Sequence, residues 1–238
     1  YKDKVSPAID VAFVAPRPET MAAVFGASVQ GTLIVPIWTT TPWTLPANRA
    51  VALHADVDYV LVQAGDKAYV VADDLHVSVM ARYGLDDFVV LGHAKGAALE
   101  NSVLAHPFED REVPIILGDH VTTEAGTGCV HTAPAHGQDD FVVGQHYGLP
   151  VENPVNSSSC FIDAVKDFAG MHVYKANDPI IDALKARDVL LAHEDLEHSY
   201  PHCWRHKKPL IFRATPQWFI SMDKKGLRGK ALAAVKKT

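Results

Sequence analysis

Short apolar runs separated by turn residues dominate the first two thirds of the chain. Runs of about four to eight such residues are typical of β-strands, whereas helices place apolar residues three and four positions apart. The segment Ala64-Gly65-Asp66 separates two of these runs and predicts a β-hairpin. We predict strands at residues 9–15, 31–38, 57–63, 67–72, 86–91, 113–117, 127–132 and 189–196.

Fewer segments carry the capping and breaking residues of helices. We predict helices at residues 19–25, 73–83, 139–147 and 177–187, with two more beginning at Pro216 and at Asp223. Many short strands and few long helices favour a mainly β fold. We therefore expect a closed β-barrel core with α-helices packed around its periphery.

Charge divides the chain into two unequal regions. The formal net charge is −6, but residues 1–200 hold 12 basic and 27 acidic side chains, whereas residues 201–238 hold 10 basic and one acidic side chain. We expect a β-barrel domain at residues 1–196 and a basic C-terminal segment at residues 197–238. The basic segment is compatible with a solvated helical tail and with nucleic-acid contact.

Composition excludes several protein classes. Apolar residues make up 48% of the chain and charged residues 21%, as in ordinary globular proteins. Cys129, Cys160 and Cys203 are too few and too scattered for a disulfide framework, which indicates a reducing compartment, the cytoplasm. No apolar run approaches the ~18 residues of a membrane-spanning helix, and no signal peptide is present. Because the chain opens on Tyr1 rather than Met, we expect it to be part of a longer protein.

Residues 38–48 (WTTTPWTLPAN) form the first segment with candidate chemistry. Prolines fix the backbone, and threonines present hydroxyls that both donate and accept hydrogen bonds. Such a loop can hold a water molecule or a sugar hydroxyl. It is equally compatible with a turn whose hydroxyls bond only to their own backbone.

Residues 126–141 (GTGCVHTAPAHGQDDF) form the second segment, which resembles a strand, a tight turn and the start of a helix. One of Asp139 and Asp140 can cap the helix, which leaves the other free to pair with an ammonium group. His131 is compatible with a packed side chain, a general base or a pocket wall. Cys129 shares a strand face with His131, but no neighbour activates the thiol, and we expect a small buried side chain.

A third group, His198, His202, Cys203 and His206, raises the question of a metal site. Its spacing matches no standard zinc pattern, and the chain lacks a second cysteine pair. We therefore predict no bound metal.

The first two segments resemble the editing domain, or connective peptide, of class I isoleucyl-tRNA synthetases. Residues 199–223 (SYPHCWRHKKPLIFRATPQWFISMD) are similar to the stretch where that insertion returns to the catalytic domain. Valyl and leucyl relatives carry Arg-Pro-Glu or Arg-Pro-Asp after their threonines, where this chain has Thr41-Pro42-Trp43. The resemblance therefore favours the isoleucyl member. It also implies the valyl, isoleucyl and leucyl editing-domain fold.

The resemblance implies a role for each matching residue. Asp140 corresponds to the aspartate that binds the substrate's α-ammonium group. Thr39, Thr40 and Thr41 correspond to the peptide that contacts the terminal adenosine and the scissile ester and helps to place water. These four residues are the catalytic candidates.

Further positions correspond to the wall and edge of the same pocket. His131 matches the histidine that limits side-chain size, and Asn48 matches an asparagine at the pocket edge. Ala135 departs from the glycine of some relatives, with little expected consequence. The substrate-binding candidates are Asn48, His131, Trp38, Thr44 and His136.

The resemblance implies hydrolysis of valine from the 3′ end of tRNA(Ile), with valyl-adenylate as a second substrate. Neither the HIGH nor the KMSKS signature of the synthetic site is present. We therefore expect no cofactor for editing, because ATP serves only the synthetic domain of the parent enzyme. The expected partners are tRNA and the parent synthetase domains, with a monomeric chain and no membrane contact. Two alternatives stay open: a tRNA-binding module inactive in isolation, and the editing domain of a valyl or leucyl enzyme.

Overall fold

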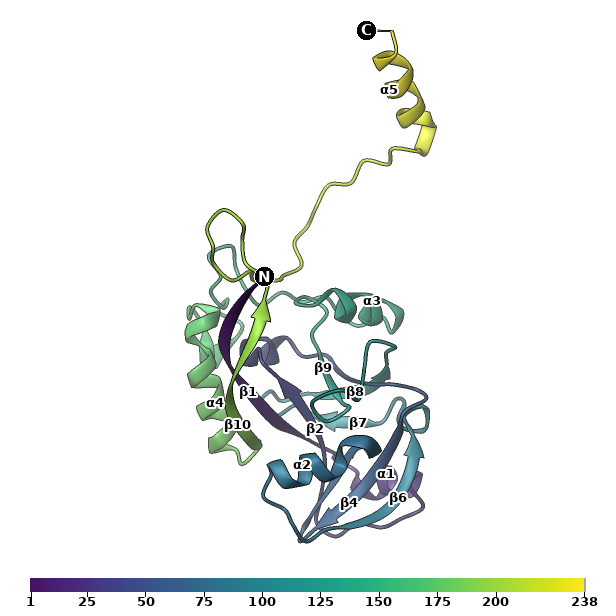
Figure 1. Ribbon diagram of the computed structural model, residues 1–238, viewed down its shortest axis with the longest axis vertical. Coiled ribbons are helices and arrows are strands. Elements are labelled where there is room, and N and C mark those ends of the chain that lie inside the picture. Colours follow the sequence, from purple (N-terminus) through teal and green to yellow (C-terminus); the bar gives the residue numbers. More distant parts are fainter. Residues whose placement is uncertain (238) are drawn as a thin grey trace.

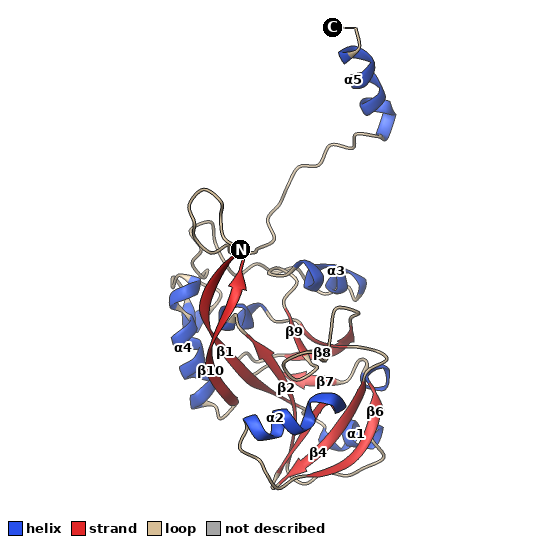
Figure 2. Cartoon of the chain, viewed as in Figure 1, coloured by secondary structure: helices blue, strands red, loops and turns tan. Residues whose placement is uncertain are grey.

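A computed structural model describes residues 1–237 of the protein. Four α-helices lie around a large β-sheet, and a fifth stands apart from it near the C-terminus (Figures 1 and 2). The helices are α1 (Pro18–Val24), α2 (His76–Arg82), α3 (Gln138–His146), α4 (Asn177–Ala186) and α5 (Leu227–Val235). The strands are β1 (Lys2–Val14), β2 (Thr32–Thr39), β3 (Ala50–Leu53), β4 (Asp58–Ala64), β5 (Lys67–Ala72), β6 (Val89–Lys95), β7 (Val103–Ala105), β8 (Glu112–Leu117), β9 (Val130–Thr132) and β10 (Leu190–Tyr200).

The ten strands form one mixed sheet in the order β6-β4-β5-β2-β1-β7-β8-β3-β9, with β10 paired to β1. The pairs β2–β5 and β3–β8 are parallel, and the other pairs are antiparallel. Over residues 1–237 the two end strands, β6 and β9, do not pair with each other. The expected closed barrel is therefore wrong, although the mainly β composition is confirmed.

The parallel pairing of β2 with β5 is short for a local reason. Pairing of β2 with β5 ends at Ile34, two residues before Pro36, which has no N–H for a further rung. The loop before β9 lies at this gap: Thr127 Oγ1 donates to the Pro36 carbonyl (2.7 Å), and the Thr127 carbonyl accepts the Ala72 N–H (3.0 Å). Gly128 follows with φ +78°, which turns the chain out of the extended conformation. Beyond Ile34, two hydrogen bonds of Thr127, one to β2 and one to β5, thus take the place of direct pairing between these strands.

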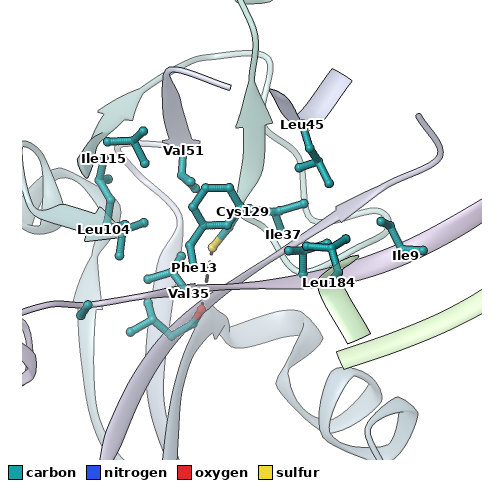
Figure 3. Packing of buried hydrophobic residues seen from close by; sticks show 14 of the residues in the cluster. Ile9, Phe13, Val35, Ile37, Leu45, Val51, Leu104, Ile115, Cys129 and Leu184 are labelled. Carbon is teal, nitrogen blue, oxygen red and sulfur yellow. Dashed lines mark hydrogen bonds between the residues drawn. The ribbon is translucent and has the colours of Figure 1, made fainter. Parts of the chain in front are cut away.

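The main apolar core is formed by side chains of β1–β5, β7 and β8, with α1 and α4 packed against them (Figure 3). Figure 3 shows Ile9 and Phe13 of β1 beside Val35 and Ile37 of β2, with Leu184 of α4 close by. Leu45, in the 3₁₀ helix Pro42–Ala47, is fully buried in the same cluster. The threonine-rich segment is therefore anchored to the core by its own apolar side chain.

The C-terminal part differs from its prediction. The strand expected at residues 189–196 extends to Tyr200 as β10, so the predicted boundary at 196/197 lies inside a strand that pairs with β1. The helix expected from Pro216 does not form, since residues 216–220 have no regular secondary structure. A helix does form later, as α5, and it stands apart from the body at the end of an extended stretch (Figure 1).

None of the helices described in residues 1–237 is long and apolar enough to cross a membrane.

Candidate functional site

The two motif segments meet at one cavity of about 230 Å³. One side comes from the end of β2 and the 3₁₀ helix that follows it, and the other from β9 and the start of α3. The lining residues are Trp38, Thr39, Thr41, Thr44, Val130, His131, Ala133, His136, Gly137 and Asp140. Two predicted residues, Thr40 and Asn48, are not among them, while Val130, Ala133 and Gly137 were not predicted.

Prolines shape the threonine side of the cavity. Pro42 occupies the first turn of the 3₁₀ helix, where its missing N–H and fixed φ are tolerated. Thr39 Oγ1 accepts the Thr41 N–H (3.1 Å), and Thr44 Oγ1 donates to the Thr41 carbonyl (2.9 Å), so these hydroxyls do cap the turn. Among residues 1–237, the Thr41 hydroxyl forms hydrogen bonds only with other hydroxyls, at 3.2 Å to Thr39 and 3.5 Å to Thr44. Its remaining hydrogen-bonding capacity is available to a ligand.

His131 is a buried, uncharged part of the wall. The Asn48 side-chain amide donates to Nδ1 (2.7 Å), so Nε2 carries the proton and donates to Thr44 Oγ1 (2.9 Å). Burial lowers the pKa of His131 to about 3. Because both ring nitrogens are engaged and the ring is neutral, it cannot act as the general base. Of the three interpretations of the sequence, the pocket wall fits this geometry.

Asp140 carries the acidic group of the cavity. It lies in the first turn of α3, and its Oδ2 accepts the Ala133 N–H (2.7 Å). Burial raises the pKa of Asp140, against the lowering effects of that hydrogen bond and of nearby His120. A Cβ at Gly137 would lie 2.7 Å from Asp140 Cγ, so only glycine lets this carboxyl group lie against the turn. Adjacent Asp139 is exposed and lines a different cavity.

The basic C-terminal segment supports the same wall without lining the cavity itself. His136 Nδ1–H donates to the Phe212 carbonyl (2.9 Å), and the His136 ring packs edge-on against Trp43 with centroids 5.0 Å apart. The Ala214 N–H donates to the Ala135 carbonyl (2.7 Å). The segment therefore fixes one side of the cavity before it leaves the body.

The remaining candidate groups lie elsewhere. Cys129 is 2% exposed in the core, and burial raises its pKa, so the thiol is an inert packed side chain, as expected. Cys203 Sγ lies 3.4 Å from His206 Nδ1, but His198 bonds to Ser6 and His202 to the Tyr200 carbonyl. Within residues 1–237, no three His, Cys, Asp or Glu side chains converge as metal ligands would.

Comparison with known proteins decides the family. Residues 30–184 match the family model described as "Leucyl-tRNA synthetase, editing domain". The chain belongs to this editing-domain family. Proteins named isoleucine–tRNA ligase are similar to the domain over nearly its whole length: that of Alkalilimnicola ehrlichii is 57% identical over 99% of the chain, and that of Legionella pneumophila (strain Corby) 58% over 96%. The resemblance drawn from the motifs is confirmed.

The domain spans only 26% of the first of these relatives and 25% of the second. Solved editing domains of cytosolic leucyl-tRNA synthetases share its fold. That of P. knowlesi has a TM-score of 0.62 at 12% identity, covering 80% of the chain and 97% of that structure. That of P. falciparum (space group P21) has a TM-score of 0.59 at 11% identity, covering 82% and 99%.

Proposed function

We propose that the domain hydrolyses valine from wrongly acylated tRNA(Ile). The observation that supports this most is the shared cavity: a carboxyl group, threonine hydroxyls and a neutral imidazole lie around one small hollow. An aminoacyl ester offers an ammonium group, a reactive carbonyl and a side chain. Each of these has a matching group in the wall.

Recognition begins at the ammonium group. The carboxylate of Asp140 faces the cavity from the positive end of α3 and pairs with the substrate's α-ammonium group. The positive charge of the ammonium group also offsets the desolvation that raises the pKa of Asp140 in the absence of substrate. Binding therefore favours the ionised form.

Hydrolysis needs no covalent enzyme intermediate. A water molecule attacks the ester carbonyl, the bond to the ribose oxygen breaks, and that oxygen takes the proton as valine leaves. Threonine hydroxyls are poor nucleophiles without a paired base, and His131 has no free nitrogen to serve as one. The Thr41 hydroxyl instead orients the water against an ester that is already reactive.

Selectivity comes from shape. One methylene in an apolar pocket discriminates by only ~1–3 kcal/mol, and isoleucine against valine in isoleucyl-tRNA synthetase is itself the standard illustration of that limit. A second site that excludes the larger chain supplies the missing factor. The hydrogen-bonded ring of His131 is a rigid wall suited to that exclusion.

Valyl-adenylate carries the same ammonium group and an equally reactive acyl carbonyl, so it is the second candidate substrate. A tRNA-binding role without hydrolysis is the alternative that the basic C-terminal segment supports.

A deacylation assay tests the proposal. The chain is incubated with valyl-tRNA(Ile), with isoleucyl-tRNA(Ile), and with tRNA(Val) and tRNA(Leu) that each carry a wrong amino acid. We expect fast release from valyl-tRNA(Ile) alone. Asp140→Ala should slow this release by roughly a hundredfold, the upper range for a hydrogen bond to a charged group. Asp139→Ala, its exposed neighbour, should match wild type.

Equal rates for the two variants would refute the role of Asp140. Salt-sensitive tRNA binding without hydrolysis would instead establish the binding-module alternative, because phosphate contacts weaken steeply with salt.

A further inference from the structure

The loop between β7 and β8 holds the end of the threonine segment from behind. The 3₁₀ helix Pro42–Ala47 ends there, where the Leu45 carbonyl accepts the Asn48 N–H (2.9 Å) and the Pro46 and Asn48 carbonyls follow. Two side chains of the loop, His106 and Arg111, donate to these carbonyls. Neither residue lines the cavity.

His106 is a fixed, neutral donor. Its Nε2–H donates to the Leu45 carbonyl (3.0 Å), while Nδ1 accepts the N–H groups of Phe108 (3.3 Å) and Glu109 (3.0 Å). These bonds set its tautomer, and the side chain is buried. The loop is thus a rigid support rather than a mobile flap.

Arg111 donates to two further carbonyls, those of Pro46 and Asn48. One terminal nitrogen, Nη2, donates to Pro46 (2.9 Å) and to Asn48 (3.0 Å). A cation is favourable at this position because it meets the negative end of the helix. Burial, followed by the positive charge of Arg49, lowers the pKa of Arg111. Burial and Arg49 thus disfavour the charge on the guanidinium group, whereas its bonds to the Pro46 and Asn48 carbonyls favour it.

The Asn48 contact connects Arg111 to the cavity. Asn48 is fully buried, and its amide donates to the Ala50 carbonyl (2.8 Å) and to His131 Nδ1 (2.7 Å). We propose that Arg111 is a positioning residue that fixes Asn48, and through it the orientation of the His131 ring, and so sets the size limit of the editing pocket. This inference rests on the proposed function.

Arg49 provides a matched control. It lies beside Arg111 in the cavity behind the threonine segment, and its side chain pairs with Glu152 rather than with the 3₁₀ helix. Arg49→Gln and Arg111→Gln each remove one positive charge from this second cavity, which is distinct from the candidate site. Only Arg111→Gln removes the bonds to Pro46 and Asn48.

The experiment measures two quantities on the chain. The first is the ratio of isoleucyl-tRNA to valyl-tRNA deacylation. We expect Arg111→Gln to raise this ratio about tenfold, the low end of what a hydrogen bond from a charged donor supplies, and Arg49→Gln to leave it unchanged. Arg111→Lys keeps the charge but reaches the carbonyls with one flexible ammonium group, and should give an intermediate ratio.

The second quantity is the ¹⁵N shift of the His131 ring nitrogens, which requires no tRNA. Wild type and Arg49→Gln should show only the Nε2–H tautomer, and Arg111→Gln a mixture of both tautomers. An unchanged ratio or an unchanged tautomer in Arg111→Gln overturns the inference, as does a parallel fall in both rates. If Arg111→Gln does not fold, the same criteria apply to Arg111→Lys. If wild type deacylates neither substrate, the proposed function fails, and the tautomer alone decides whether Arg111 positions the ring.

Discussion

The side-chain amide of Asn48 donates to Nδ1 of His131 across 2.7 Å, and this bond determines which groups donate and which accept in the hydrogen bonds that follow it. Because Nδ1 accepts, Nε2–H must donate to Thr44 Oγ1, whose own O–H donates to the Thr41 carbonyl. The imidazole is therefore fixed in tautomer and in orientation without carrying charge.

The size limit of the cavity should depend on the His131 ring. We expect His131→Ala to let the chain release isoleucine from isoleucyl-tRNA(Ile), while valine release continues. The substitution also removes one hydrogen-bond partner from the Asn48 amide and one from Thr44 Oγ1, and should lower the free energy of unfolding by about 1–3 kcal/mol. Deacylation of both substrates, with His146→Ala on the exposed side of α3 as the control, checks this prediction. Continued rejection of isoleucine would contradict it.

Adjacent threonines should differ in their effect on hydrolysis. Thr41 lines the cavity and its hydroxyl keeps free hydrogen-bonding capacity, whereas Thr40 is not part of the lining. We expect Thr41→Val to lower the single-turnover rate on valyl-tRNA(Ile) by about tenfold or more, and Thr40→Val to have a much smaller effect. An equal loss in both variants would mean that this peptide acts through its backbone alone.

Asp140 should reduce stability at neutral pH, where it serves binding. Burial raises its folded-state pKa above the ordinary 3.8, so the ionised form is disfavoured in the folded chain. The contribution of this group to stability is fully present below pH 3.8 and is lost as pH rises through the raised folded pKa. Asp140→Asn should therefore unfold at a higher temperature than wild type at pH 7, with the difference vanishing near pH 3. Thermal melts at both pH values test this, and a variant less stable at pH 7 would refute it.

The two buried histidines should make the fold sensitive to acid. Burial lowers the pKa of both His106 and His131 to about 3, from an ordinary value of 6.5. The unfolded chain takes up these protons first, so the stabilising contribution is present above pH 6.5 and is lost as pH falls toward 3. Each histidine should lower the free energy of unfolding by about 1.4 kcal/mol per pH unit in this window. Urea titrations between pH 7 and about 4 measure the slope, and His106→Gln should reduce it.

The sequence locates the cavity because its chemistry is carried by two compact segments. Thr41 and Thr44 occur in a proline-bounded stretch that cannot be a core strand, and His131 and Asp140 flank a turn into a helix. The local structure of each segment follows from its own sequence, because hydrogen bonds between its side chains and its backbone stabilise it. The resemblance then supplied the roles, which the geometry alone does not assign.

Other features depend on contacts that no local pattern records. The loop before β9 meets a strand distant in sequence where the pairing of β2 with β5 ends, and Thr127 Oγ1 donates to the Pro36 carbonyl there. Arg111 acts on carbonyls more than 60 positions earlier in the chain, from a loop with no periodicity. The helix predicted from Pro216 lacks a surface to pack on, since Trp218 is fully exposed, and short helices are marginal without packing.

The antiparallel pairing of β1 with β10 has a mechanical consequence. Lys2 lies opposite Tyr200 at one end of this ladder, and toward the other end Ile9 lies opposite both His193 and Thr39. A pull on Tyr1 at the N-terminal end would therefore peel the ladder apart from the Lys2–Tyr200 rung. Tension would have to open the rungs one after another before it disturbed Thr39. Displacement of the N-terminal end is thus absorbed along β1 and β10, whereas a pull on the C-terminal segment meets the Phe212–His136 and Ala214–Ala135 hydrogen bonds first.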